Sequence, residues 1–134
     1  MLKKFTNKKG FTLMEMLIVV AIIAILVAIA IPTFSSSLAK ANAATDLANI
    51  RSGYAAAQIK AMTETVTNGT TLYLQKDGSV AESGTSDYTC KGESADVSGE
   101  NEIGGKDFTL SWGKGKKITY TISGGMVTAI GTAE

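Results

Sequence analysis

One carboxylate stands inside a long apolar run near the start of the chain, and it is the side chain with the clearest chemistry. Between Phe11 and Phe34 the only charged residue is Glu15. A carboxylate in a lipid-crossing helix costs roughly 2.5–3.5 kcal/mol at the helix centre and less near its end. Such a group implies a partner. A basic arm precedes the run, with Lys3, Lys4, Lys8 and Lys9.

The apolar run is long enough to cross a membrane. About 20 apolar residues at ~1.5 Å rise per residue span the ~30 Å hydrocarbon core. We therefore expect residues 11–34 to form a transmembrane helix in membrane lipid. Lysines before the span predict that the N-terminal arm stays in the cytoplasm and that everything after Phe34 lies outside.

The junction between the basic arm and the apolar run resembles the class III signal of type IV prepilins. The resemblance covers residues 8–32 and rests on Gly10, Phe11 and Glu15, with apolar-for-apolar departures at Met14 and at Met16-Leu17. It implies that a membrane prepilin peptidase cleaves after Gly10 and methylates the new N-terminal Phe11. Residues 1–10 would then be a leader peptide.

Two ordinary readings compete with a prepilin signal. A secretory signal peptide could be removed at the small residues around Ala28-Ile29-Ala30 or Ala41-Asn42-Ala43. The apolar segment is too long for that reading, and Glu15 interrupts it. A simple signal anchor would leave Glu15 without a purpose.

The helix is expected to continue beyond the membrane over residues 35–62. Pro32 removes one backbone donor from the carbonyl of Ala28, which predicts a helix kink at Pro32. Apolar residues then recur at steps of three and four, which predicts an amphipathic helix. We expect Leu47, Ile50 and Tyr54 to pack against a sheet, and the polar residues Lys40, Asn42, Asp46, Asn49 and Lys60 to lie away from that face.

The remaining residues, 63–134, predict a globular β head. A helix-to-sheet (αβ) loop over 63–107 contains one short strand at Leu72-Tyr73-Leu74. A C-terminal β-meander over 108–131 is expected from alternating apolar and polar residues at 108–112, 118–122 and 126–130, with a tight hairpin at Ser123-Gly124-Gly125. A long helix laid on an antiparallel sheet is an α+β fold, which is also the type IV pilin fold.

Several other patterns in the head have an ordinary structural interpretation. The acidic loop from Asp96 to Glu102 lacks the spacing of a calcium loop, so no metal site is expected. Asn68-Gly69-Thr70 matches a glycosylation sequon but also a helix-ending turn. The cluster of Lys114, Lys116 and Lys117 is expected to be a solvated hairpin tip. Cys90 is the only cysteine, so no disulfide forms within the chain, and we expect it to be half-buried.

Composition excludes the common catalytic classes. The chain has no histidine, no Cys/His ligand set, no phosphate-binding glycine loop after a strand and no serine elbow, so no catalytic residues and no cofactors are expected. Four of the 13 basic residues precede Gly10, and the nine that remain face 12 acidic residues. A mildly acidic surface does not favour nucleic acid.

The resemblance implies a structural subunit of a type IV pilus. Its partners would be copies of itself in a helical filament, the prepilin peptidase, and the assembly platform with its ATPase. The filament would lie outside the cell and serve adhesion, motility or biofilm formation. The disulfide-free head is similar to those of Gram-positive pilins. Two alternatives remain open, a pseudopilin of a type II secretion or DNA-uptake system and a membrane-anchored binding domain that never polymerises.

Overall fold

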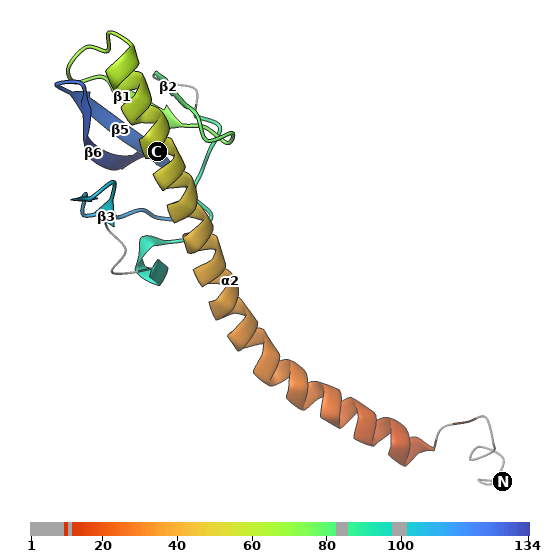
Figure 1. Cartoon of the computed structure of the whole chain (residues 1–134). Coiled ribbons are helices and arrows are strands. Elements are labelled where there is room, and N and C mark those ends of the chain that lie inside the picture. The colour runs from red at the N-terminus through yellow and green to blue at the C-terminus, as the bar shows by residue number, and fades with distance from the viewer. Residues whose placement is uncertain (1–9, 11, 83–85, 98–101) are drawn as a thin grey trace. The chain divides into compact units, whose positions relative to one another are not determined.

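The computed structural model describes residues 10, 12–82, 86–97 and 102–134. The chain consists of two compact units, Met1–Ser37 and Leu38–Glu134. One long helix, α2, runs through the first unit into the second, and the strands found among the described residues belong to the second (Figure 1). We call residues 38–134 the head unit.

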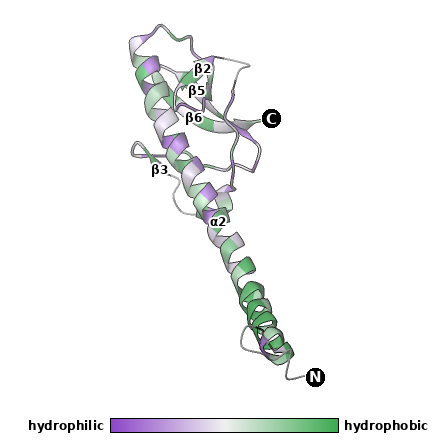
Figure 2. Cartoon of the chain, turned by 90° about the vertical axis from the view of Figure 1, so that its right-hand side faces the viewer, coloured by the Kyte–Doolittle hydropathy of each residue, from purple (hydrophilic) through white to green (hydrophobic). Residues whose placement is uncertain are grey.

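Helix α2 spans Leu13–Thr63 and contains 51 residues. Its first half is hydrophobic on all sides, whereas its second half mixes polar and apolar residues (Figure 2). The helix ends where threonines, an asparagine and Gly69 replace good helix formers. The last turn closes with a bond from the Glu64 N–H to the Lys60 carbonyl, at 2.9 Å.

The main sheet has four antiparallel strands in the order β2-β1-β5-β6. These strands are β1 (Thr71–Leu74), β2 (Val80–Glu82), β5 (Lys117–Ser123) and β6 (Met126–Ala133). The β5–β6 hairpin turns through Gly124 and Gly125, which have φ values of 62° and 75°. Two successive positive φ angles are those of a type I′ turn, which suits the twist of antiparallel strands.

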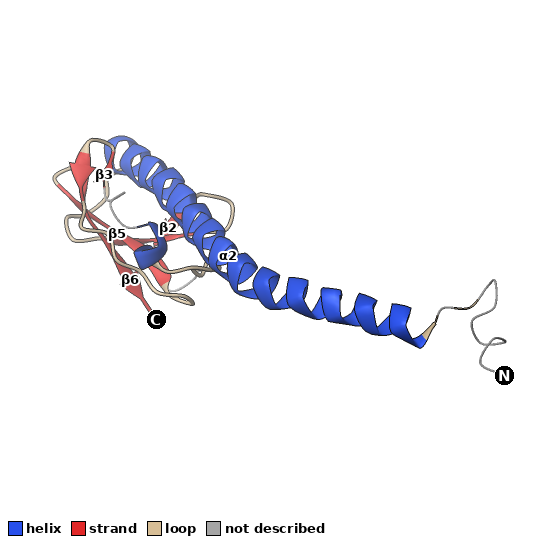
Figure 3. Cartoon of the chain, turned by 90° about the horizontal axis from the view of Figure 1, so that it is seen from below, coloured by secondary structure: helices blue, strands red, loops and turns tan. Residues whose placement is uncertain are grey.

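The core of the head unit lies between α2 and one face of this sheet (Figure 3). Along β5, every second residue is buried, namely Ile118, Tyr120 and Ile122. Residues of α2 spaced by three and four cover them, and those that are buried are Ala43, Asp46, Leu47, Ile50, Gly53, Ala57 and Ala61. The structure thus confirms the expected α+β arrangement.

The predicted strand at 108–112 is absent, so the expected three-stranded meander over 108–131 is wrong in its first strand. Thr109 has a φ of 50°, a left-handed conformation that interrupts an extended chain. Trp112 pairs with Ser94 instead of with a strand, since its N–H donates to Ser94 Oγ and its carbonyl accepts from the Ser94 N–H. Leu110 and Trp112 are nevertheless buried, which explains the apolar alternation.

Residues 63–107 contain more regular structure than the expected loop. Besides β1, which was predicted, they form β2, a short 3-10 helix η1 (Ser94–Val97), and a separate two-stranded sheet of β3 (Glu102–Ile103) and β4 (Lys106–Asp107). Strand β5 therefore has β6 on one side and β1 on the other, and it pairs with β1 through Thr71, Leu72 and Tyr73.

Candidate functional site: the start of the long helix and its anchors in the head

A reciprocal pair of hydrogen bonds caps the start of α2. The Thr12 N–H donates to Glu15 Oε2 at 2.7 Å, and the Glu15 N–H donates to Thr12 Oγ1 at 3.1 Å. Threonine followed three residues later by glutamate is a capping box, which satisfies two backbone donors that the helix cannot. The negative charge of Glu15 also suits the positive end of the helix dipole.

The sequence predicted that Glu15 needs a partner, and Thr12 was not among the partners considered. The Thr-x-x-Glu spacing before an apolar run is a known helix-start signal, so the cap was readable from residues 12–15. Gly10 is exposed and lies outside the helix, while Phe11 and residues 1–9 lie outside the described residues. Pairing of Glu15 with a neighbouring Phe11 amine therefore stays a prediction.

A continuous apolar surface follows the cap. All of the large apolar side chains from Leu13 to Phe34 are exposed, by between 45% and 79%. This part of α2 is long and apolar enough to cross a membrane, by length and composition alone. So much exposed apolar area requires a cover, either lipid tails or other helices.

Helical structure continues through Pro32 without interruption. Pro32 lacks an N–H, so the Ala28 carbonyl has no helical donor from it. Next to it, the Thr33 hydroxyl donates to the Ile29 carbonyl at 3.1 Å, a contact that commonly bends helices. These contacts favour a local loosening, and the kink itself stays a prediction.

The three residues proposed for helix–sheet packing all lie at the core of the head unit. Leu47 and Ile50 are buried, and Tyr54 is partly buried against the same cluster. The Tyr54 ring lies 5.5 Å from the ring of Phe108, between centroids. The Tyr120 hydroxyl donates to the Ile50 carbonyl at 2.7 Å, which ties β5 directly to the backbone of α2.

Gly53 is the point of closest approach between α2 and the sheet. A Cβ at this position would lie 2.6 Å from Leu74 Cδ1 and would also collide with the Tyr120 hydroxyl. A glycine inside a helix is ordinarily a weak point, because it lowers the helix propensity. The structure instead shows that a side chain here would push the helix away from β1 and β5.

Asp46 is fully buried, which corrects the expectation that it lies away from the packed face. Its carboxylate accepts the Tyr88 hydroxyl at 2.6 Å, the Lys91 N–H at 3.0 Å and the Gly92 N–H at 2.7 Å. Hydrogen bonds to a carboxylate are strong and offset its loss of water. We call these four residues the Asp46 clamp.

The Asp46 clamp holds the segment Tyr88–Gly92 against α2. Asn49 Nδ2 donates to the Tyr88 hydroxyl at 3.1 Å, so that hydroxyl both donates and accepts. Burial, together with its bond to Asp46, raises the pKa of Tyr88. A Cβ on Gly92 would lie 2.9 Å from Ala43 Cα, so only glycine permits this approach.

Cys90 lies inside the clamped segment and is buried more deeply than expected, with 2% of its surface exposed. Burial raises the pKa of its thiol to about 12, and the Asp46 carboxylate adds to this shift. Its N–H donates to the Lys116 carbonyl and its carbonyl accepts from the Gly115 N–H, both at 2.8 Å. The segment is therefore tied to the turn before β5 as well as to the helix, and the thiol is unreactive at neutral pH.

The remaining candidates of the head show no arrangement for chemistry. Within the described ranges, no three His, Cys, Asp or Glu side chains lie close enough to hold a metal, and residues 98–101 of the acidic loop from Asp96 to Glu102 fall outside those ranges. Lys116 is paired with Glu134. Asn68 Oδ1 accepts the Gly124 N–H at 2.8 Å, so the sequon residue helps to hold the β5–β6 turn.

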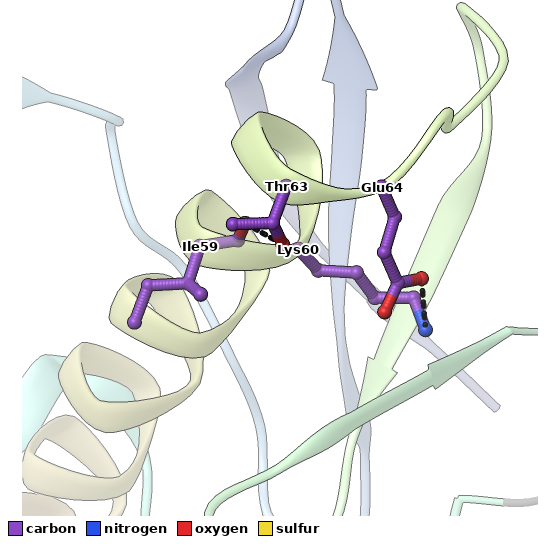
Figure 4. Close-up of polar contacts among 4 residues, drawn as sticks. All are labelled: Ile59, Lys60, Thr63 and Glu64. Atoms are coloured by element: carbon purple, nitrogen blue, oxygen red, sulfur yellow. Dashed lines mark hydrogen bonds and ion pairs between the residues drawn. The ribbon is translucent and has the colours of Figure 1, made fainter.

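A shallow groove of about 360 Å³ lies between the end of α2 and β2. Ala56, Ile59 and Val80 contribute apolar walls, and Lys60 and Glu64 form an ion pair at 3.2 Å on its rim. The Thr63 hydroxyl donates to the Ile59 carbonyl at 2.7 Å, while the Ile59 side chain points away from this contact (Figure 4). The groove offers an apolar surface but no chemical groups in a catalytic arrangement.

Two comparisons with known proteins give a match. The family profile described as the prokaryotic N-terminal methylation motif matches residues 5–31. The "Type IV narrow pilus major component PilA5" of Thermus thermophilus is 50% identical over 56 residues, which cover 40% of this chain and 48% of the relative. The match thus spans about half the length of that relative. No solved structure matches.

Proposed function

We propose that this chain is a type IV pilin-like protein that is cleaved after Gly10 and then polymerises through its N-terminal helix into a surface filament. The observation that carries the proposal is the capped carboxylate of Glu15 at the start of a fully exposed apolar helix. The cap would serve the start of any helix, so the proposal gives Glu15 a second role, which is supported by the N-terminal methylation motif over residues 5–31.

Transfer from membrane to filament exchanges one apolar environment for another. Lipid tails are as apolar as neighbouring helices, so the hydrophobic term nearly cancels, and close packing and polar pairing decide the balance. Cleavage at Gly10 removes four lysines that would otherwise enter the filament core. It also creates an α-ammonium on Phe11, four residues before Glu15.

Glu15 of one subunit would pair with the Phe11 ammonium of the next. An unpaired buried charge costs several kcal/mol, whereas a paired and hydrogen-bonded one is tolerated. A carboxylate has two oxygens with about four acceptor positions, and the bond from the Thr12 N–H uses one of them. The cap and the intersubunit pair are therefore compatible, and the cap fixes where the carboxylate stands.

A pilus subunit would need several further partners. Prepilin peptidase would act at Gly10 and methylate Phe11, an assembly platform with its ATPase would extract the helix from lipid, and the assembled fibre would serve adhesion, motility or biofilm formation. As a precursor the chain would be a single-pass protein of the cytoplasmic membrane. Support comes from the methylation motif and from the Thermus pilus component.

The decisive experiment combines intact mass with electron microscopy of material sheared from cells. We expect a chain that begins at Phe11, carries one added methyl group and forms long fibres. Processed chains without long fibres would instead indicate a pseudopilin of a secretion or DNA-uptake system. A monomer that retains Met1 would be a membrane-anchored domain and would contradict the proposal.

A further inference from the structure

The main sheet has two edge strands, β2 on one side and β6 on the other. An edge strand presents backbone N–H and C=O groups that can pair with a strand of another chain, and charged side chains or proline usually prevent this. Strand β6 has no charged residue and no proline over its eight residues. Its composition therefore leaves the edge open.

Only the second half of β6 is available for pairing. A bulge interrupts the register between β5 and β6 at Thr121 and Ile122, and the Val127 N–H donates to Gln58 Oε1 at 3.1 Å. The bulge disrupts the ladder there, and Gln58 occupies a backbone donor of the edge. Residues 129–133 follow these obstacles, and all of them are exposed or partly exposed.

The hydrogen bonds of β5 show which backbone groups of β6 point outward. The Ile122 N–H donates to the Thr70 carbonyl at 2.9 Å, so the backbone groups of Ile122 face β1. Because this direction alternates along a strand, every second residue of β5 faces β1 as well. Ile130 and Thr132 lie opposite two such residues, so their N–H and C=O groups point away from the sheet.

The same alternation applies to β2, at the other edge. The Gln75 N–H donates to the Ser79 carbonyl at 2.9 Å, so the backbone groups of Ser79 face β1. Those of Val80 and Glu82 therefore point outward. Each edge thus offers two residues, spaced by two, whose backbone groups are free to pair.

The outward-pointing residues of both edges lie on the face of the sheet that α2 covers. Ile130 lies opposite Tyr120, and Val80 lies opposite Leu74, which are both buried under the helix. Residues opposite each other in an antiparallel pair share a face. The shallow groove of about 360 Å³ beside β2 is on this face, with Val80 and Ile59 among its walls.

We propose that the second half of β6 of one copy adds to β2 of a second copy as an antiparallel strand. Ile130 pairs with Glu82, and Thr132 pairs with Val80, through their outward backbone groups. The partly exposed Ile130 side chain then lies diagonally opposite Val80, where the groove can receive it. The occupant of the β2 edge and its groove is therefore a second copy of this chain.

The topology of the sheet favours this pairing of unlike edges. Four antiparallel strands give two edges that run in opposite directions, so two copies in the same orientation meet with antiparallel strands. The paired residues of both copies lie on the helix-covered face, so α2 of both copies lies on one face of the joined sheet. Antiparallel pairing of β6 with β6 would instead reverse one helix relative to the other.

Copies that share a membrane or a filament have their long helices in the same direction, which excludes the reversed arrangement. A contact between unlike edges of identical chains repeats as an open array. This inference rests on the proposed filament and specifies how neighbouring heads meet in it.

Cysteine pairs test the contact directly. In sheared filaments of the variant Glu82→Cys/Thr132→Cys, the two positions of neighbouring copies should be diagonal neighbours at about 7 Å. We expect a short bifunctional maleimide to produce a ladder of covalent multimers from this variant and none from either single variant. Glu82→Cys/Lys106→Cys is the matched control, because Lys106 is exposed on the separate β3–β4 sheet. Background is low because Cys90 is buried.

The outcomes separate this contact from the filament itself. Normal filaments without a ladder from the Glu82/Thr132 pair would overturn the edge contact and leave the filament intact. Cross-linked dimers from Thr132→Cys alone would mean that like edges meet, and would also overturn it. Monomers from the unmodified chain would overturn both proposals.

A second measurement removes one backbone donor from the edge. The Thr132 N–H points outward, so Thr132→Pro deletes an intersubunit donor without deleting a bond between β5 and β6. We expect it to lower filament yield several-fold while urea unfolding of the head is unchanged, and Thr132→Ser, which keeps the N–H, to give normal yield. Equal yields from the proline and serine variants would contradict the edge contact.

Discussion

Glu15 and Asp46 are two carboxylates on the same helix, and the structure treats them in opposite ways. Glu15 lies in an exposed segment and takes its partner from three residues away. Asp46 is fully buried, and its partners come from 42 to 46 residues away. A local partner leaves a charge available for a second role, whereas a set of distant partners commits it to holding the fold.

The strongest test of this contrast is removal of Glu15. Glu15→Ala should lower filament yield by about tenfold or more, because each ~1.4 kcal/mol of lost pairing is a factor of ten. Head stability and cleavage at Gly10 should be unchanged. The amount of sheared filament measures the assembly defect, and intact mass shows whether cleavage at Gly10 has occurred.

Glu15→Gln separates the charge from the cap. The amide oxygen still accepts the Thr12 N–H, but the side chain no longer neutralises an ammonium. Filament loss with Gln as severe as with Ala would assign the effect to charge. Filaments of normal length and yield from Glu15→Ala would contradict the assembly role.

Removal of Asp46 should have the opposite pattern. Asp46→Ala leaves the buried Tyr88 hydroxyl and the Lys91 and Gly92 N–H groups without their acceptor, which should lower the free energy of unfolding by about 2–4 kcal/mol. Urea unfolding of the full chain in detergent, followed by near-UV circular dichroism, measures it. Asp46→Asn keeps one acceptor oxygen but turns an amide NH2 toward a backbone N–H, so it should also lower the free energy of unfolding. An unchanged free energy of unfolding in Asp46→Ala would contradict the clamp.

Gly53→Ala tests how closely the helix lies on the sheet. The added methyl group meets Leu74 and Tyr120, and overpacking of this kind costs about 1–3 kcal/mol. Alanine also favours helix by up to ~1 kcal/mol, so the net loss should be at the lower end. Gly113→Ala is the control, because a Cβ at Gly113 would meet, besides its sequence neighbours, only a Lys116 carbon at 3.9 Å. A gain in stability from Gly53→Ala would contradict the close approach.

The smallest effect is expected from Thr12→Val, which removes the hydroxyl of the cap. Loss of an N-cap residue costs about 1 kcal/mol of helix stability. Hydrogen exchange at the amide of Glu15 should accelerate while exchange in the head stays constant. Thr12→Ser keeps the hydroxyl and should restore protection, and protection unchanged in both variants would show that the cap contributes nothing.

The sequence was sufficient where structure follows from neighbours along the chain. The apolar run, the three-four spacing after Pro32 and the alternation in residues 118–122 and 126–130 each predicted an element that is present. Each depends on a local period, 3.6 residues for the helix and two for the strands. The Thr12–Glu15 cap belongs to the same class and was readable.

Prediction from the sequence failed where the partner of a residue lies far away along the chain. Asp46 was placed on the outer face because a charged side chain is seldom buried, and its acceptor role depends on Tyr88, Lys91 and Gly92 folding back onto it. Leu110 and Trp112 alternate like strand residues, but the chain there bonds to Ser94 and bends at Thr109. An alternation of apolar and polar residues indicates which side chains are buried, but burial alone does not show that the segment is a strand.

The order of the strands also sets when the head can fold. Strand β1 is the next element after the helix, yet it pairs with β5, whose residues come 46 to 50 positions later; Thr71 and Thr121 form the most distant pair. Pairing so distant slows folding, because a long loop must close first. The helix can enter the membrane early in synthesis. Leu47 and Ile50 then stay exposed until β5 and β6 have been synthesised and have formed the sheet that covers them. The interval between insertion and completion is therefore the period in which this chain is most exposed to proteolysis and misassembly.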